Sequence, residues 1–231
     1  MIEVFESTDK YPLQKIGKFA GVCWNSPIDN AEKNIKRAKE CILSGHGRVL
    51  EYVDIELCIK GYSARAIREY YTHIGGSPTR LQESTRYVDC ENFDFFVPPT
   101  VKNAKTEKHT SCNESAFDIY NECMSFIREK YGELLETGVS KEDAANILPL
   151  GMMTKIVDKR NLRNMINLMN QRLCTRAYCE IRTLANEIKS VLSEYSDEWK
   201  WICDNLFVPK CDVTGFCTEK KCCGRRPKKE I

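Results

Sequence analysis

The stretch Asn161–Ile181, NLRNMINLMNQRLCTRAYCEI, decides the fold because its apolar residues recur at helical spacing. Residues three and four positions apart share one face of a helix, so this spacing predicts one amphipathic helix or two joined end to end. The apolar stripe consists of Leu162, Met165, Ile166, Met169 and Leu173.

Polar side chains lie beside this stripe, namely Asn161, Arg163, Asn167 and Arg172. Guanidinium and amide groups can hold planar, anionic or amide-bearing ligands. A solvated helix face would have the same composition, so the pattern alone leaves a binding face and a solvated face open.

Length and charge set the broad class. With 231 residues and 42% hydrophobic content, the chain can bury one sizeable core, and we expect a single domain over 1–231. The net charge of +2, from 35 basic and 33 acidic residues, predicts neither a nucleic-acid nor a membrane partner. The sequence shows no long apolar run and no secretory leader, so we expect a cytoplasmic protein.

Thirteen cysteines, an odd number without a secretion signal, predict reduced thiols. From about residue 203 the chain is predicted to be a cysteine-rich, basic tail. Four of its thiolates could chelate zinc, although their spacings of eight, six and five match no usual zinc knuckle, and a group of reduced cysteines is the other reading. These four are Cys203, Cys211, Cys217 and Cys222.

Strands and helices are expected along the rest of the chain. Alternation predicts strands at 2–5, 53–60 and 93–97, and helical spacing predicts helices over 64–71 and 115–136. A further helix is expected to start at Pro27 and Asp29 and to stop at Gly45, and others are expected after Ser140 and from 175 to about 192.

The loop Gly75-Gly76-Ser77-Pro78 ends the helix at 64–71. Such a loop exposes backbone N–H groups, and the hydroxyls and guanidiniums around it are typical of a phosphate site. An ordinary connection between a helix and a strand would explain the loop equally well. The polar residues around it are Thr72, His73, Thr79, Arg80, Gln82, Ser84 and Arg86.

Taken in chain order, these motifs resemble the flavin-dependent thymidylate synthases. That family's late signature is Asn-x-Arg, Asn, Leu-Arg and Ala-Gln-x-Glu-Ile, and this chain has Asn161-Leu162-Arg163, Asn167, Gln171-Arg172 and Ala177-Tyr178-Cys179-Glu180-Ile181. Ser84-Thr85-Arg86-Tyr87 resembles the end of the family's Arg-His-Arg motif, and His73 its central histidine. His46 and Glu51 match the family's His-x-Ser/Thr-x-Leu/Phe-Glu-His stretch.

The chain also departs from the family pattern. Thr72 and Ile74 stand where the two arginines flank the histidine, and Ala145 stands where an arginine binds the nucleotide phosphate. A buried phosphate needs compensating charge, so another group must replace them if the substrate is unchanged. Arg80 and Arg48 are the candidates.

The resemblance implies an α+β flavoenzyme with a small antiparallel sheet and surrounding helices, assembled as a homotetramer. It implies reductive methylation of dUMP to dTMP, with methylenetetrahydrofolate as carbon donor, FAD as cofactor and NADPH as reductant. Arg172 is the expected catalytic residue. The expected flavin contacts are His46, Glu51, His73, Asn161, Arg163 and Asn167, and the expected nucleotide contacts are Arg68, Glu69, Arg80, Gln82, Ser84, Arg86 and Arg172.

Other functions stay open on the sequence. The lost arginines suit a flavin-dependent enzyme that modifies another pyrimidine nucleotide. A nucleotide-binding protein that has lost catalysis, or an interaction module held by zinc, would belong to a different class.

Overall fold

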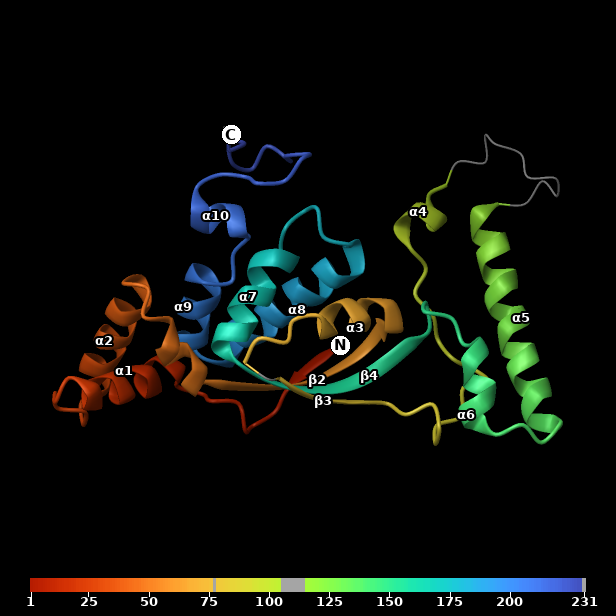
Figure 1. Cartoon of the computed structure of the whole chain (residues 1–231), viewed down its shortest axis with the longest axis horizontal. Coiled ribbons are helices and arrows are strands. Elements are labelled where there is room, and N and C mark those ends of the chain that lie inside the picture. The colour runs from red at the N-terminus through yellow and green to blue at the C-terminus, as the bar shows by residue number, and fades with distance from the viewer. Residues whose placement is uncertain (77, 105–114, 230–231) are drawn as a thin grey trace. The chain divides into compact units, whose positions relative to one another are not determined.

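The computed structural model describes residues 1–76, 78–104 and 115–229. Figure 1 shows that one or more helices separate successive strands along the chain. In order, the elements are β1 (Ile2–Val4), α1 (Pro12–Cys23), α2 (Ala31–Leu43), the 3₁₀ helix η1 (Gly47–Tyr52), β2 (Asp54–Ser63), α3 (Ala64–Tyr71), β3 (Thr79–Gln82), α4 (Pro99–Lys102), α5 (Ala116–Glu136), α6 (Lys141–Ala144), the 3₁₀ helix η2 (Ala145–Ile147), β4 (Met153–Asn161), α7 (Leu162–Arg172), α8 (Cys179–Tyr195), α9 (Asp197–Asn205) and α10 (Lys210–Thr214).

The described residues fall into two compact units, whereas the sequence predicts one domain. The first unit contains Met1–Ile59, Glu69–Leu81 and the described part of 157–231, and the second contains Lys60–Arg68 and Gln82–Ile156 within the described ranges.

The four strands form one small, open sheet in the order β1-β2-β4-β3. Strand β1 pairs with β2 in antiparallel register, with Glu3 opposite Cys58. Ile55, Leu57 and Ile59 on β2 are fully buried, while the residues between them are partly exposed, as the alternating pattern predicts. The predicted combination of a small antiparallel sheet and helices is confirmed.

The stretch Asn161–Ile181 forms two helices of the first unit. The Asn161 side chain caps α7 by accepting a hydrogen bond from the backbone N–H of Asn164 at 2.9 Å. Helix α7 ends at Arg172, and α8 begins only at Cys179. The inward face of α7 is fully buried at Leu162, Met165, Leu168 and Met169.

The helices α1 and α2 of the same unit lie side by side (Figure 1). Asn34 of α2 leaves no room for a side chain at Gly17 of α1, because a β-carbon there would collide with the Asn34 carbonyl. This close approach explains the glycine.

The second unit contains the long helix α5, with α6 beside it (Figure 1). Its hydrophobic cluster consists of Cys90, Phe93, Met124, Tyr131, Ala144 and Met152. Ser115 and Asp118 form a capping box at the start of α5, which supports the helix predicted over 115–136.

Two strand predictions need correction. The predicted strand at 93–97 is wrong, because only Phe95 makes a bridge, to Met152, while Phe93 packs into the cluster instead. Strand β4 was not predicted at all. Its buried positions alternate as Thr154, Ile156, Asp158 and Arg160, so half of the inward side chains are charged and hide the apolar pattern.

Candidate active site

A guanidinium and an imidazole meet in the first unit, where the end of α7 faces the residues after α3. Arg172 Nε donates a hydrogen bond to His73 Nε2 at 3.0 Å. Its other two nitrogens make longer contacts, to Glu69 Oε2 at 3.3 Å and to Thr72 Oγ1 at 3.4 Å. The sequence pointed to Arg172 and His73 separately, and the structure brings them together.

The contact with Arg172 defines the protonation of His73. Arginine only donates hydrogen bonds, so Nε2 of His73 must be unprotonated and the imidazole proton must lie on Nδ1. Burial, and then the nearby guanidiniums of Arg172, Arg160 and Arg80, lower the pKa of His73 from 6.5 to about 4. His73 is therefore a neutral imidazole at physiological pH.

A network of buried polar side chains lies on β4 and was missed by sequence reasoning. Arg160 donates to Asp158 through Nε (2.6 Å) and Nη2 (2.8 Å), and both side chains are fully buried. Tyr70 of α3 donates its hydroxyl to the same carboxylate at 2.8 Å. Burial raises the pKa of Tyr70 well above its usual range, so the phenol stays protonated and keeps donating.

The network continues to the loop that carries His73. Arg160 Nη1 donates to Asn164 Oδ1 at 2.7 Å. Asn164 Nδ2 in turn donates to the backbone carbonyls of His73, at 3.2 Å, and of Gly75. The only sequence signal for this network was a pair of opposite charges two residues apart, which more often marks an exposed strand face.

The residues expected to contact flavin lie mainly on α7 and η1 of the first unit. Arg163 pairs with Glu51 at 2.5 Å, and the two side chains are 52% and 39% exposed. Asn167 lies one helical turn beyond Arg163 and is also exposed. His46, just before η1, is exposed as well. Asn161 caps α7, and a side chain at Gly76 (φ +75°) would collide with its amide.

The residues expected to contact the nucleotide are divided between the units. Glu69, Arg80 and Arg172 belong to the first unit, where Arg80 donates to the Tyr71 carbonyl at 2.9 Å and stacks on its ring. The others belong to the second unit, and they are Arg68, Gln82, Ser84 and Arg86.

Within the second unit these polar groups lie near the surface. Gln82 donates to Thr154 Oγ1 at 3.4 Å, and Arg86 pairs with Glu142 at 2.9 Å. Ser84 Oγ accepts from the backbone N–H of Arg86 at 3.3 Å. The side chain of Arg68 is exposed.

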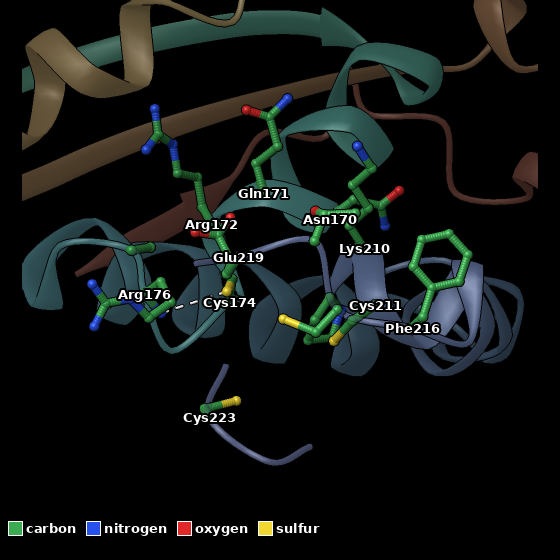
Figure 2. A pocket seen from close by; sticks show the side chains of 14 residues that line it. Asn170, Gln171, Arg172, Cys174, Arg176, Lys210, Cys211, Phe216, Glu219 and Cys223 are labelled. Carbon is green, nitrogen blue, oxygen red and sulfur yellow. Dashed lines mark hydrogen bonds between the residues drawn. The ribbon is translucent and has the colours of Figure 1, made fainter. Parts of the chain in front are cut away.

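The cysteine-rich segment and the end of α7 form a pocket of about 490 Å³, which Arg172 also lines. Cys174, Cys211, Cys217 and Cys223 line it, and Figure 2 shows the Arg172 guanidinium pointing away from the sulfur atoms of Cys174 and Cys211. Among the residues that the structure describes, no three metal-binding side chains are arranged to hold a metal ion.

Cys203 lies outside this cysteine pocket. It is fully buried on α9, and burial raises the pKa of its thiol to about 12. Because zinc binds thiolates, Cys203 does not suit the role of a zinc ligand. The folded part of the first unit also extends past the predicted start of the tail at 203, since Phe207 is fully buried.

The fold and the site define an α+β protein in which a guanidinium contacts a neutral imidazole and a buried amide holds the backbone beside that imidazole. Residues 4–195 match the family model described as "Thymidylate synthase complementing protein". The chain therefore belongs to the flavin-dependent thymidylate synthase family, which confirms the resemblance seen in its motifs.

Three relatives show how far the similarity extends, and each is named a flavin-dependent thymidylate synthase. The protein from Clostridium tetani is 28% identical over 90% of this chain and 86% of its own length. The protein from Nitratidesulfovibrio vulgaris is 30% identical over 80% of this chain and 73% of its own length. The protein from Geobacter sulfurreducens is 33% identical over 76% of this chain and 69% of its own length.

No helix in the described ranges is both long enough and apolar enough to cross a lipid bilayer.

Proposed function

We propose that this protein converts dUMP to dTMP by reductive methylation, with methylenetetrahydrofolate as carbon donor, FAD as cofactor and NADPH as reductant. Family membership supports the reaction class. The observation that carries the proposal is the half-buried guanidinium of Arg172, which is held between His73 and Glu69.

Arg172 is the proposed catalytic residue. Its short bond from Nε to His73 fixes the plane of the guanidinium, while the longer contacts of Nη1 and Nη2 can be exchanged for a ligand. Two N–H groups aimed at the N3–C4=O edge of uracil would stabilise negative charge that develops on the ring.

His73 and α7 would hold the flavin. The Nδ1–H of His73 can donate, since its Nε2 already accepts from Arg172. Arg163 and Asn167 lie four residues apart on one face of α7 and are both exposed, which fits an extended ligand along the helix. Asn161, His46 and Glu51 complete the proposed flavin contacts. The bound flavin would supply the hydride that completes the methyl group.

Each unit has its own set of proposed nucleotide contacts. In the first unit, Glu69 orients Arg172, and Arg80 supplies positive charge near His73. In the second unit, Arg86 is the proposed phosphate ligand, because its exposed pair with Glu142 is weak enough to exchange for a phosphate. Arg68, Gln82 and Ser84 are proposed as further contacts.

A second candidate is the same flavin chemistry on another pyrimidine nucleotide. It is favoured by one observation, the absence of arginine at Thr72, Ile74 and Ala145, where the family has it. Changed phosphate or base contacts are the simplest consequence of losing three cations.

We also propose that the protein assembles as a homotetramer with flavin sites at subunit interfaces. Light scattering should then give about four times the chain mass of 26.7 kDa. A monomer would contradict this assembly.

The test uses purified protein reconstituted with FAD and reduced without oxygen. Addition of dUMP and methylenetetrahydrofolate should reoxidise the flavin and yield dTMP. Bound flavin that is reoxidised only with a different pyrimidine nucleotide would favour the second candidate, and protein that binds no flavin would contradict both.

Substitution of Arg172 tests its assigned role. Arg172→Ala should lower turnover with dUMP by about 10²–10³-fold, as the loss of a preorganised donor does, and should leave bound flavin largely in place. Arg226→Ala is the matched control, because Arg226 also pairs with a carboxylate, Asp212, but lies in the cysteine-rich segment. Equal turnover in the two variants would contradict the role of Arg172.

A further inference from the structure

The Asp158–Arg160 pair is unusual because both charges are fully buried on a strand. Removing two charges from water is unfavourable, and such pairs can often be replaced by apolar residues without loss of stability. A gain in fold stability is therefore a weak explanation for the presence of this pair. The contacts of Asp158 and Arg160 indicate another role.

Arg160 is closed to a ligand, because its side chain is buried and each of its three guanidinium nitrogens already donates to a protein neighbour. Nε and Nη2 donate to Asp158, Nη1 donates to Asn164, and the guanidinium lies 4.1 Å from the centre of the Tyr70 ring. Only about 1% of the residue is exposed. Any influence on the site must therefore pass through its protein neighbours.

Arg160 decides the orientation of the Asn164 amide. Because a guanidinium can only donate, Asn164 must present Oδ1 to Arg160 and Nδ2 to the opposite side. On that side, Nδ2 meets the backbone carbonyls of His73 and Gly75. If the amide were reversed, Nδ2 of Asn164 would face the N–H groups of Arg160, and Oδ1 would face the carbonyls of His73 and Gly75.

The pair also fixes the start of the same segment. Tyr70, three residues before His73, donates to Asp158. Residues 70–75 are thus held at both ends by β4 and the first turn of α7, with His73 between them. His73 then contacts Arg172 through Nε2.

We propose that Asp158, Arg160 and Asn164 are positioning residues that set the orientation of His73 and, through it, of Arg172. This role rests on the proposed function of Arg172. Residues 70–75 of this chain have Thr72 and Ile74 where the family has arginines. Here the guanidinium of Arg160, on β4, holds this segment through Asn164.

The decisive variant is Asn164→Asp. It keeps the size of the side chain and the bond from Arg160, but it replaces the N–H donors to His73 and Gly75 by an acceptor. The matched control is Asn170→Asp on the same helix. Asn170 Nδ2 also donates to two backbone carbonyls, of Leu206 (3.3 Å) and Val208 (2.7 Å), and these belong to a different loop.

The measurement is the ¹⁵N spectrum of histidine-labelled protein. The chain has three histidines, so His73→Gln assigns the signal of His73. In the unsubstituted protein Nε2 should show the shift of an unprotonated nitrogen and Nδ1 that of a protonated one. Asn164→Asp should move the His73 signals toward a mixture of the two tautomers, whereas Asn170→Asp should leave them unchanged.

A second variant separates positioning from folding. In Asp158→Leu/Arg160→Met the pair is replaced by apolar side chains, so no buried charge is left unpaired. We expect a folded protein with altered His73 signals and with kcat lowered on the order of 10²-fold, as a misplaced group causes. If this variant does not fold, Asn164→Asp decides the matter alone.

Unchanged His73 signals in either folded variant would overturn the proposal and leave the network a purely structural role. The spectrum does not depend on turnover. If the unsubstituted protein forms no dTMP but the variants still alter the His73 signals, the proposed function is contradicted and the positioning role is supported.

Discussion

At the scale of single residues, the neutral state of His73 follows from its surroundings. The side chain is 8% exposed, and the nearest charged groups that act on its pKa are guanidiniums. A protonated imidazole would lose its acceptor atom for Arg172 and would face a like charge. The neutral ring, in contrast, links Arg172 to the loop and keeps one N–H for a ligand.

The depressed pKa of His73 predicts that stability depends on pH. Between pH 4 and 6.5 the unfolded chain binds a proton at His73 that the folded chain does not, so the free energy of unfolding should rise with pH over this window and level off above it. Urea denaturation at pH 4.5 and 7 measures the difference, and His73→Gln should reduce it.

His46→Gln is the control for the substitution itself, because His46 is an exposed histidine outside the contact between His73 and Arg172. If His73→Gln and the unsubstituted protein lose the same free energy on acidification, His73 does not have the low pKa.

Single-sequence reasoning identified the residues of this pair but not their contact. Arg172 and His73 were singled out by different motifs, nearly a hundred positions apart, and no spacing rule connects them. The sequence does not single out Asn164, because an asparagine at the third position of a helix is common, and only its buried environment reveals that it holds two carbonyls.

At the scale of elements, the sequence predicts well where burial is apolar and poorly where it is polar. Helix α5 and strand β2 were found at nearly the observed bounds, since their buried positions are apolar. Strand β4 was missed because Asp158 and Arg160 occupy inward positions. The sequence does not decide between one helix and two over Asn161–Ile181, because the apolar stripe does not show where the backbone leaves the helix.

The start of α7 gives a prediction at this scale. Asn161 caps the helix, so Asn161→Ala should lower the free energy of unfolding by about 1 kcal/mol, the usual loss for an N-cap. Asn161→Ser can still cap and should recover most of this loss. Chemical denaturation of both variants measures it.

Flavin affinity separates the two roles of Asn161. If the amide also contacts flavin, Asn161→Ser should restore stability but bind flavin more weakly than the unsubstituted protein. A serine variant as unstable as the alanine variant would show that capping is not what Asn161 contributes to folding.

At the scale of the whole molecule, the match to the family ends at residue 195, but the folded part of the first unit does not. Helix α9 follows directly, and its residues Trp199 and Ile202 are fully buried. Trp199 Nε1 donates to the Asp9 carbonyl at 2.7 Å, so this segment holds the beginning of the chain. The sequence does not predict helix α9, because a helix about two turns long gives little periodic signal.

Glu198 makes the link between α9 and α1 testable. Its carboxylate accepts from the backbone N–H groups of Leu13 (2.7 Å) and Gln14 (3.1 Å) at the start of α1, and from the Gln14 side chain (2.7 Å). A carboxylate in this place satisfies helix N–H groups that would otherwise lack partners and faces the positive end of the helix dipole.

Glu198→Ala should therefore destabilise the protein by about 1.5–3 kcal/mol, the range for hydrogen bonds to a charged group. Glu198→Gln keeps an acceptor and should lose clearly less. Glu194→Ala, at an exposed glutamate near the end of α8, serves as the control and should change stability by no more than about 0.5 kcal/mol. Urea denaturation that gives Glu198→Ala the same midpoint as Glu194→Ala would contradict the idea that α9 stabilises the start of α1.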